Sequence, residues 1–352
     1  MLAAEIFYHK LNFTIPGGTS RGILKKKPTW YIKIYYNNKP SIYGLGECSP
    51  IKGLSIESVD EMMNQLKKVQ KSINDLSSLD LSLFPSIQFG IESALRDLKN
   101  GGKRIIFQNS FAQGKPIKIN GLIWMGNKDF MVNQIKSKIE KGFSCLKLKI
   151  GSIDFMEEIS ILKNIRKQFS PKILEIRVDA NGALSTKDVF KKLETLGELK
   201  IHSIEQPIAI NQWDYLREVC EKSPIPIALD EELIQLKKEK NEFIKYISPH
   251  YLVLKPTLIG GFEATQKWID IAEKNNINWW VTSALESNVG LNAIAQFCAN
   301  YQLTLPQGLG TGQLFSNNIP SPLEIKSENI FYKKNKTWDL SNFEKSNDNY
   351  RL

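Results

Sequence analysis

The chain has 352 residues, of which 42% are hydrophobic and 24% are charged, and this composition excludes wholesale disorder and fibrous repeats. No apolar run approaches the roughly 18–20 residues that a membrane-spanning helix needs, and the first residues lack the basic and apolar segments of a secretory signal. The formal net charge is +10, yet the longest basic run is Lys25-Lys26-Lys27. Because nucleic-acid surfaces need clustered basic residues with interleaved aromatics, we interpret the dispersed lysines as solvated surface.

These properties predict a cytoplasmic protein that binds neither nucleic acid nor a membrane, and they leave its oligomeric state open. Four cysteines are far apart and form no CxxC pair, which favours reduced, mostly buried thiols over disulfides or a zinc site. They are Cys48, Cys145, Cys220 and Cys298.

The first hundred residues have the pattern of an α+β unit. Residues 7–15, 29–38 and 42–50 have strand composition, and Pro16-Gly17-Gly18 predicts a turn that ends the first strand. Apolar spacing predicts helices over 57–69 and 87–98.

From residue 117 onward, short apolar runs alternate with polar helical stretches. Polar residues that end these runs are spaced 25 to 30 residues apart, which is one strand plus one crossover helix. The runs are 117–125, 143–150, 173–180, 201–207, 224–231, 250–256, 278–284 and 303–310. Eight such units favour a β/α barrel over a doubly wound sheet, whose phosphate-binding GxGxxG is missing after the first strand.

Charged residues stand where the predicted strands end, which is where barrel enzymes place their chemistry. Asp179, Glu205 and Asp230 come from three successive strands, and three carboxylates form the hard oxygen site that Mg²⁺ prefers. Lys147 and Lys149 precede them on one strand face, and Lys255 follows. The alternative interpretation is that the acids only neutralise the lysines as structural ion pairs.

The lysines suit proton transfer from a carbon acid. A lysine beside other cations and a bound metal has a lowered pKa, which brings it towards the range of a base near pH 7. The metal would hold a substrate carboxylate and stabilise the enediolate that forms when the α-proton leaves.

In these residues the sequence resembles the enolase superfamily, in particular its muconate-lactonising-like branch. The matching motifs are Lys147-Leu148-Lys149, Arg177-Val178-Asp179-Ala180-Asn181, Glu205-Gln206-Pro207, Asp230-Glu231, Leu254-Lys255-Pro256 and, near the N-terminus, Gly46-Glu47-Cys48-Ser49-Pro50. The resemblance implies a (β/α)7β-type TIM barrel at 113–315 and an N-terminal α+β capping domain at 1–112 that is completed by 316–352.

Within that superfamily the chain is similar to the o-succinylbenzoate synthase family of menaquinone biosynthesis. The stretches concerned are 119–124, 282–287 and 308–312. The resemblance implies a lyase that dehydrates a 2-succinyl-6-hydroxy-cyclohexadiene-1-carboxylate to o-succinylbenzoate. It implies Mg²⁺ as the cofactor, with Mn²⁺ as a substitute, and a small-molecule carboxylate as the binding partner.

The resemblance also assigns roles to individual residues. Asp179, Glu205 and Asp230 would bind the metal, Lys149 would remove the proton, and Lys255 would stabilise the enediolate. Lys147 would lie beside the substrate carboxylate. Further contacts to the substrate are expected from Asn181, Glu231 and Ser283.

Two other functions stay open. Two lysines facing each other also suit a dipeptide or N-succinyl amino acid epimerase, although residues 310–312 lack the acids that a free-amine substrate would need. A remote alternative is a non-catalytic basic barrel that binds RNA or protein. The loops 17–27 and 51–55 are expected to close over the succinyl group, with Lys25–Lys27 solvated rather than in contact with its carboxylate.

Overall fold

The computed structural model describes residues 1–19, 22–151, 153–236 and 238–341. An antiparallel sheet forms its N-terminal part, in the order β1 (Leu2–Thr19), β2 (Gly22–Tyr36) and β3 (Tyr43–Cys48). The predicted turn at Pro16-Gly17-Gly18 is wrong, because β1 continues to Thr19. The pairing with β2 shifts register between Asn12 and Gly17, and such an irregularity accommodates a proline that cannot donate to the ladder.

Two helices cover one face of this sheet: α1 (Met62–Lys71) and α2 (Pro85–Lys99), joined through a short 3₁₀ helix at Leu76–Ser78. The helix predicted over 87–98 is confirmed by α2. The other predicted helix begins late, because the Glu57 side chain accepts a hydrogen bond from the Ser86 backbone at the start of α2 (3.1 Å) instead of entering α1. Between them, α1, α2 and the sheet enclose a core that includes Ile6, Ile32 and Leu66.

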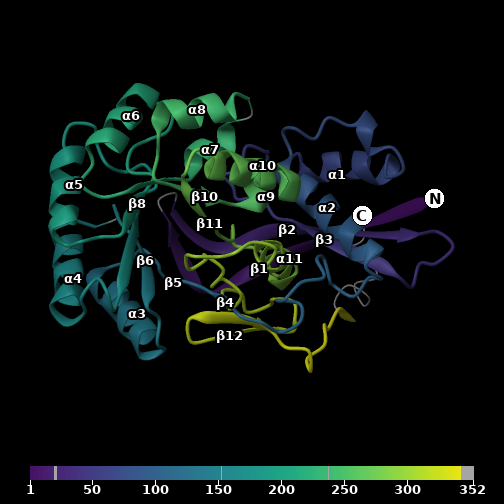
Figure 1. The fold of residues 1–352 in the computed structure, drawn as a ribbon. Helices are drawn as coiled ribbons and strands as arrows, with labels where there is room; N and C mark the ends of the chain where they lie inside the picture. Colours follow the sequence, from purple (N-terminus) through teal and green to yellow (C-terminus); the bar gives the residue numbers. More distant parts are fainter. Residues whose placement is uncertain (20–21, 152, 237, 342–352) are drawn as a thin grey trace.

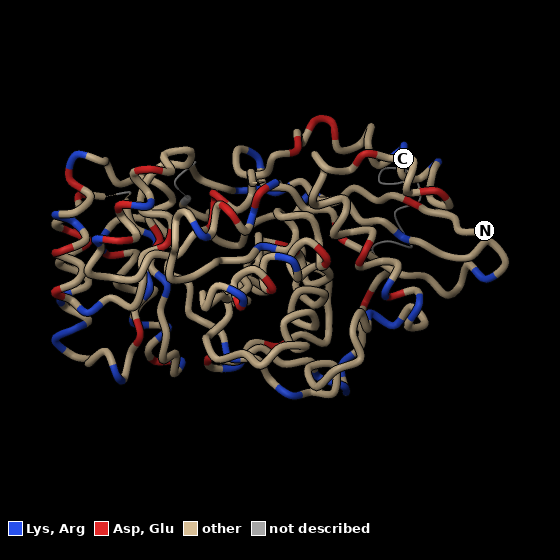
Figure 2. Tube along the Cα trace, turned by 45° about the horizontal axis from the view of Figure 1, so that its top comes forward, with Lys and Arg blue, Asp and Glu red and all other residues tan. Residues whose placement is uncertain are grey.

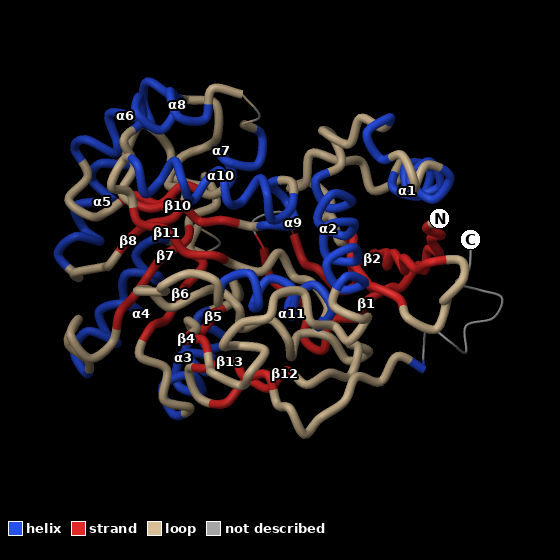
Figure 3. Tube along the Cα trace, turned by 45° about the vertical axis from the view of Figure 1, so that its right-hand side comes forward, coloured by secondary structure: helices blue, strands red, loops and turns tan. Residues whose placement is uncertain are grey.

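A seven-stranded parallel sheet forms the larger part of the molecule and curls inside a layer of helices (Figures 1 and 3). Its strands follow one another in chain order: β5 (Gly121–Ile123), β6 (Cys145–Lys149), β7 (Glu175–Asp179), β8 (Ser203–Glu205), β9 (Ile227–Leu229), β10 (Tyr251–Leu254) and β11 (Asn278–Val281). The fold class is therefore α/β, with a curled parallel sheet and a separate antiparallel sheet.

The eighth predicted run, 303–310, forms two isolated bridges rather than a strand. Gln307 bridges to Ile119 beside β5, and Gly308 bridges to Thr282 beside β11. The Gly308 amide donates to the Val281 carbonyl at 2.8 Å, and the Asn120 amide donates to the Gln307 carbonyl at 3.0 Å. Residues 307–308 thus connect the two outer strands of the sheet.

The crossover helices bury apolar residues at helical spacing against the sheet. In α4, for example, Ile159, Leu162 and Ile165 are buried and Asp154 caps the first turn by accepting from the Met156 and Glu157 amides. The helices are α3 (Lys128–Glu140), α4 (Phe155–Gln168), α5 (Val189–Glu198), α6 (Trp213–Lys222), α7 (Glu231–Gln235), α8 (Lys240–Ile247), α9 (Pro256–Ile259), α10 (Gly261–Lys274) and α11 (Asn288–Cys298).

The C-terminal segment contacts both parts of the molecule. β12 (Leu323–Lys326) and β13 (Asn329–Tyr332) form a sheet with β4 (Ile117–Lys118), which precedes β5. Upstream of them, Phe315 bridges to Phe13 of β1. Residues 342–352 of the predicted capping domain lie outside the described residues.

Global surface properties agree with the expectations from composition. The four cysteines are buried and unbridged, as predicted. Figure 2 shows basic and acidic residues interleaved along the whole trace rather than basic residues gathered on one face. Within the described ranges, no helix has both the length and the apolar character to cross a membrane.

Candidate active site

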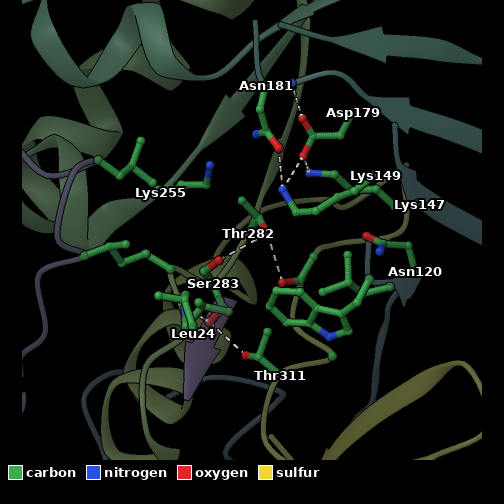
Figure 4. A pocket seen from close by; sticks show the side chains of 18 of the residues that line it. Leu24, Asn120, Lys147, Lys149, Asp179, Asn181, Lys255, Thr282, Ser283 and Thr311 are labelled. Atoms are coloured by element: carbon green, nitrogen blue, oxygen red, sulfur yellow. Dashed lines mark hydrogen bonds and ion pairs between the residues drawn. The ribbon is translucent and has the colours of Figure 1, made fainter. Parts of the chain in front are cut away.

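A pocket lies at the carboxyl ends of the parallel strands, with Leu24 of β2 in its lining (Figure 4). Strand ends supply its polar wall, which includes Lys147, Lys149, Asp179 and Lys255. Leu24 of β2, together with Ile51 and Leu54 after β3, supplies apolar surface from the N-terminal part. The pocket therefore joins charged groups of one part of the molecule to an apolar cover from the other.

Three buried carboxylates lie at the ends of neighbouring strands. Asp179 and Glu205 are paired in register as the last residues of β7 and β8, and Asp230 directly follows β9. Lys147 Nζ lies 3.1 Å from Asp179 Oδ2 and 2.6 Å from Glu205 Oε2. The Lys255 ammonium pairs with Asp230. Each of the three acids is thus neutralised by a lysine.

The donor set nevertheless suits a hard divalent cation. Asp230 Oδ1 is buried and has no hydrogen-bond partner among the described residues, and carboxylate oxygens are the ligands that Mg²⁺ prefers. In the described part of the chain no three His, Cys, Asp or Glu side chains converge as a metal site, since Lys147 contacts both Asp179 and Glu205. The residues fit a cation provided that Lys147 moves away from these two carboxylates.

The acids around two of the buried lysines, Lys147 and Lys255, decide their charge when no metal is bound. Burial favours the neutral form of Lys147, but Asp179, Glu205 and Asp230 outweigh it and raise its pKa. In Lys255 the same balance between burial and acids, led by Asp230, raises the pKa. A bound cation is expected to lower the pKa of a nearby lysine, whereas the acids alone raise the pKa of these two. Both ammonium groups are held charged.

Lys149 begins a hydrogen-bonded chain across the pocket. Its Nζ donates to Asp179 Oδ2 at 3.1 Å and to Asn181 Oδ1 at 2.8 Å. Asn181 Nδ2 in turn donates to Glu231 Oε1 at 3.0 Å. Asn181 has a left-handed backbone (φ 44°), which asparagine tolerates better than most residues. Two predicted substrate contacts, Asn181 and Glu231, therefore lie in the pocket in contact with each other.

Ser283 also lies in the pocket, where it joins a second polar group. Its hydroxyl donates to Glu286, and it accepts from Thr311 Oγ1 at 2.8 Å. Glu286 is fully buried behind the pocket wall. All nine predicted site residues thus lie near the strand ends. Seven of them line the pocket. The other two, Glu205 and Asp230, lie beneath the lining, in contact with Lys147 and Lys255.

Two residues in or beside this site escaped the sequence-based selection. Asn120 lines the pocket, and its buried Oδ1 has no hydrogen-bond partner among the described residues. Asn120 directly precedes β5, two residues before Leu122, which is paired with Lys147. Lys27 was predicted to be solvated but is buried, with 3% exposure, while Lys25 and Lys26 are exposed.

Two family profiles match this chain. The family described as "Enolase C-terminal domain-like" matches residues 131–330, and the family "MenC, N-terminal domain" matches residues 3–98. Among curated relatives, the o-succinylbenzoate synthase of Desulfotalea psychrophila is 42% identical over 92% of this chain and 98% of its own. The L-Ala-D/L-Glu epimerase of Bacillus subtilis is 24% identical over 76% of each.

Solved structures agree with these relationships. The crystal structure of MenC from Desulfotalea psychrophila matches with a TM-score of 0.85 and 39% identity, covering 94% of this chain and 99% of that one. A dipeptide epimerase from Enterococcus faecalis, complexed with Mg and a dipeptide, matches with a TM-score of 0.81 at 17% identity, over 95% and 97% of the two chains. The latter likeness shows the shared fold alone. By its profile matches and its 42% identical relative, the chain belongs to the o-succinylbenzoate synthase family of the enolase superfamily.

Proposed function

We propose that this protein is a Mg²⁺-dependent lyase that dehydrates 2-succinyl-6-hydroxy-cyclohexadiene-1-carboxylate to o-succinylbenzoate. The observation that carries the proposal is the position of Lys149 and Lys255 on opposite sides of one pocket (Figure 4). They lie at the ends of β6 and β10, which three other strands separate in the sheet. The membership in the o-succinylbenzoate synthase family supports this choice of substrate.

The metal would be held by Asp179, Glu205 and Asp230, once Lys147 moves away from Asp179 and Glu205. When bound, Mg²⁺ neutralises negative charge on the substrate carboxylate and so makes the neighbouring C–H bond more acidic. Mn²⁺ prefers similar oxygen ligands, so we expect it to substitute.

Lys149 would perform both proton transfers. In its neutral form it takes the proton from the carbon next to the carboxylate, and the enediolate of the substrate forms. The resulting ammonium then returns this proton to the hydroxyl on the adjacent carbon, the C–O bond breaks, and water leaves as the ring becomes aromatic. Because the product is aromatic, the elimination needs no second acid.

The other two lysines would act through their charge. Lys255 faces the ring from the opposite side and stabilises the negative charge of the enediolate. Lys147 would lie beside the substrate carboxylate and attract it through its positive charge. Without a metal, the acids around both lysines raise their pKa, so both are charged before the metal binds.

The remaining lining residues would bind and shield the substrate. Asn181, Glu231 and Ser283 present polar atoms to it, while Leu24, Ile51 and Leu54 cover the succinyl group and exclude water.

We assign residues 1–112 and 316–352 to a capping domain and 113–315 to a (β/α)7β barrel, with 303–310 as its closing segment. Over the residues that Figure 2 colours, the interleaving of basic and acidic residues supports an enzyme for a small carboxylate rather than a nucleic-acid binder. The similarity to a biosynthetic enzyme supports a cytoplasmic location.

The test is a direct assay of the purified protein. With Mg²⁺, it should convert the cyclohexadiene to o-succinylbenzoate, followed as loss of the diene absorbance and confirmed by mass spectrometry. Activity that survives both exhaustive chelation and Lys149→Ala would show that the assigned roles are wrong.

The competing activity requires a separate measurement. N-succinyl amino acids and dipeptides are incubated with the enzyme in deuterium oxide, and exchange at the α-carbon is followed by NMR. Rapid exchange without any dehydration of the cyclohexadiene would favour an epimerase and overturn the lyase.

A further inference from the structure

A buried group of charged and hydroxyl side chains lies where the N-terminal sheet meets the barrel, on the far side of the pocket wall. We call it the interface cluster and define it as Lys27, Glu47, Ser49, Thr257, Ser283, Glu286 and Ser287. All seven are buried. The proposed mechanism uses only Ser283 among them.

Lys27 is the cation of the interface cluster. Its Nζ donates to the Ser49 carbonyl at 3.1 Å and contacts the Ser49 hydroxyl. Burial lowers the pKa of Lys27, and among the acids that oppose this effect Glu286 acts most strongly, followed by Glu47 and Glu57. A buried ammonium at this place thus serves neighbouring carboxylates rather than solvent.

Glu47 attaches the N-terminal sheet to the barrel. Its carboxylate accepts from the Ser287 amide at 2.8 Å, the Ser287 hydroxyl at 2.6 Å and the Gly290 amide at 2.8 Å. These donors form the first turn of α11, where a carboxylate is favoured by the helix dipole. The N-terminal sheet therefore holds the segment that directly follows Glu286.

Glu286 connects the ends of two strands. Its carboxylate accepts from the Thr257 hydroxyl, the Ser283 hydroxyl and, at 2.8 Å, the Ala284 amide. Thr257 is two residues after Lys255, and Ser283 holds the Thr311 hydroxyl in the pocket. A shift of this one carboxylate would move the Lys255 segment and the Ser283 segment together.

We propose that Glu286 is a positioning residue for Lys255 and Ser283, and that the burial of Lys27 of the N-terminal sheet in the same cluster stabilises the negative charge of Glu286. Docking of the N-terminal sheet then completes the geometry of the pocket as well as covering it. This inference rests on the proposed dehydration, because its main readout is the rate of that reaction.

The experiment is a double-mutant cycle with Lys27→Met and Glu286→Gln, measuring kcat, KM and thermal unfolding of the full chain. Each single variant should lower kcat about tenfold or more, because small displacements of reacting groups are costly, with a smaller change in KM. The double variant should lose less than the product of the two single losses, because Lys27→Met would act on kcat through the charge of Glu286.

Two controls separate positioning from general loss of stability. Glu92→Gln changes another carboxylate at the contact between the N-terminal part and the barrel, where Glu92 accepts from the Phe262 and Glu263 amides of α10. This variant should leave kcat within about twofold. Lys26→Met removes the exposed neighbour of Lys27 and should do the same.

If the charge variants do not fold, Thr257→Val tests the role of Glu286 instead. It removes one donor to Glu286 while leaving every charge in place, and it should lower kcat at nearly constant KM. Thr257→Ser retains the hydroxyl and should restore kcat.

Several results would overturn the inference. Wild-type kcat in Glu286→Gln, or in Thr257→Val, would exclude a positioning role for Glu286. Losses that multiply in the double variant would exclude the coupling of Glu286 to Lys27. If the wild-type protein fails to dehydrate the cyclohexadiene, the proposed function is wrong, and additive effects of the two changes on thermal unfolding would then exclude the coupling independently.

Discussion

Lys147 and Glu205 form a buried ion pair, with 2.6 Å between Lys147 Nζ and Glu205 Oε2. The same ammonium lies 3.1 Å from Asp179 Oδ2, so one lysine neutralises two of the carboxylates that we assign to Mg²⁺. Burial and the neighbouring acids raise the pKa of Glu205, although Lys147 and Lys255 oppose this effect. Lys147 and the metal therefore compete for the same oxygens.

Lys147→Met is expected to bind Mg²⁺ more tightly than the wild-type protein. Removing a unit charge about 3–4 Å from the ligands removes a repulsion of several kcal/mol at an effective dielectric constant near 20, so the gain should be at least about tenfold. Without metal, the same variant should be destabilised by about 3 kcal/mol or more, because two buried carboxylates lose their partner. Calorimetric titration with Mg²⁺ and thermal unfolding measure the two effects.

The control for this prediction is Lys33→Met. Lys33 pairs with Glu5 at 3.7 Å and is partly exposed, so its removal should change stability little. Weaker Mg²⁺ binding in Lys147→Met would contradict the competition between this lysine and the metal.

Lys149→Ala is expected to lower kcat by at least about 10²-fold, the usual contribution of a general base. The fold should persist, because Asp179 keeps its contact with Lys147. Lys52→Ala provides a comparison, since Lys52 also lines the pocket but is exposed, and its kcat should stay within about threefold. Equal kcat values in the two variants would remove Lys149 from its assigned role.

Asn120→Ala is expected to raise KM about tenfold, with a smaller effect on kcat. The buried Oδ1 of Asn120 has no partner among the described residues, so we expect a bound substrate or an ordered water to supply one. A hydrogen bond of about 1.4 kcal/mol corresponds to a tenfold change in affinity. Steady-state kinetics and inhibition by o-succinylbenzoate check this, and an unchanged inhibition constant would place Asn120 outside the binding site.

The free energy of unfolding is expected to fall as pH rises from about 4.5 to 7, because of Glu92. Burial raises the pKa of Glu92 to about 7, although the Phe262 and Glu263 amides donate to the ionised form and Arg96 lies near it. In this pH range the folded state keeps a proton on Glu92 that the unfolded state releases. The contribution of Glu92 to the free energy of unfolding is therefore complete below the pKa of the unfolded state, and it is lost as pH rises through the pKa of the folded state. The loss should reach about 2–3 kcal/mol.

Urea unfolding at several pH values measures this slope. Glu92→Gln cannot titrate, so the difference in unfolding free energy between it and the wild-type protein should change over this pH interval. A constant difference would show that Glu92 keeps an ordinary pKa.

Gly46→Ala is expected to destabilise the N-terminal part strongly. A Cβ atom at Gly46 would lie 1.8 Å from the carbonyl oxygen of Gly90 in α2, and backbone on both sides cannot yield without separating the helix from β3. The cost should exceed the 1–3 kcal/mol that is typical of overpacking. A wild-type unfolding midpoint for this variant would contradict such close packing.

Much of the arrangement of the candidate site was predictable because it depends on strand periodicity. Parallel strands place residues of one alternation at the same edge of the sheet, so Asp179, Glu205 and Asp230 could be assigned to one site from spacing alone. The lysines on β6 and β10 followed by the same reasoning, and the family resemblance added the reaction. The helix at 87–98 was likewise visible in its apolar spacing.

The tertiary structure decided where single side chains find their partners. The sequence pattern around Lys27 predicts a solvated lysine, yet its side chain is buried and its Nζ donates to the carbonyl of Ser49, directly after the neighbouring strand β3. The long-range contacts of Glu47 with the start of α11 join residues about 240 positions apart, and no local pattern encodes such a pairing. Periodicity determines which face of an element a residue occupies, whereas the packing of separate elements decides what that face meets.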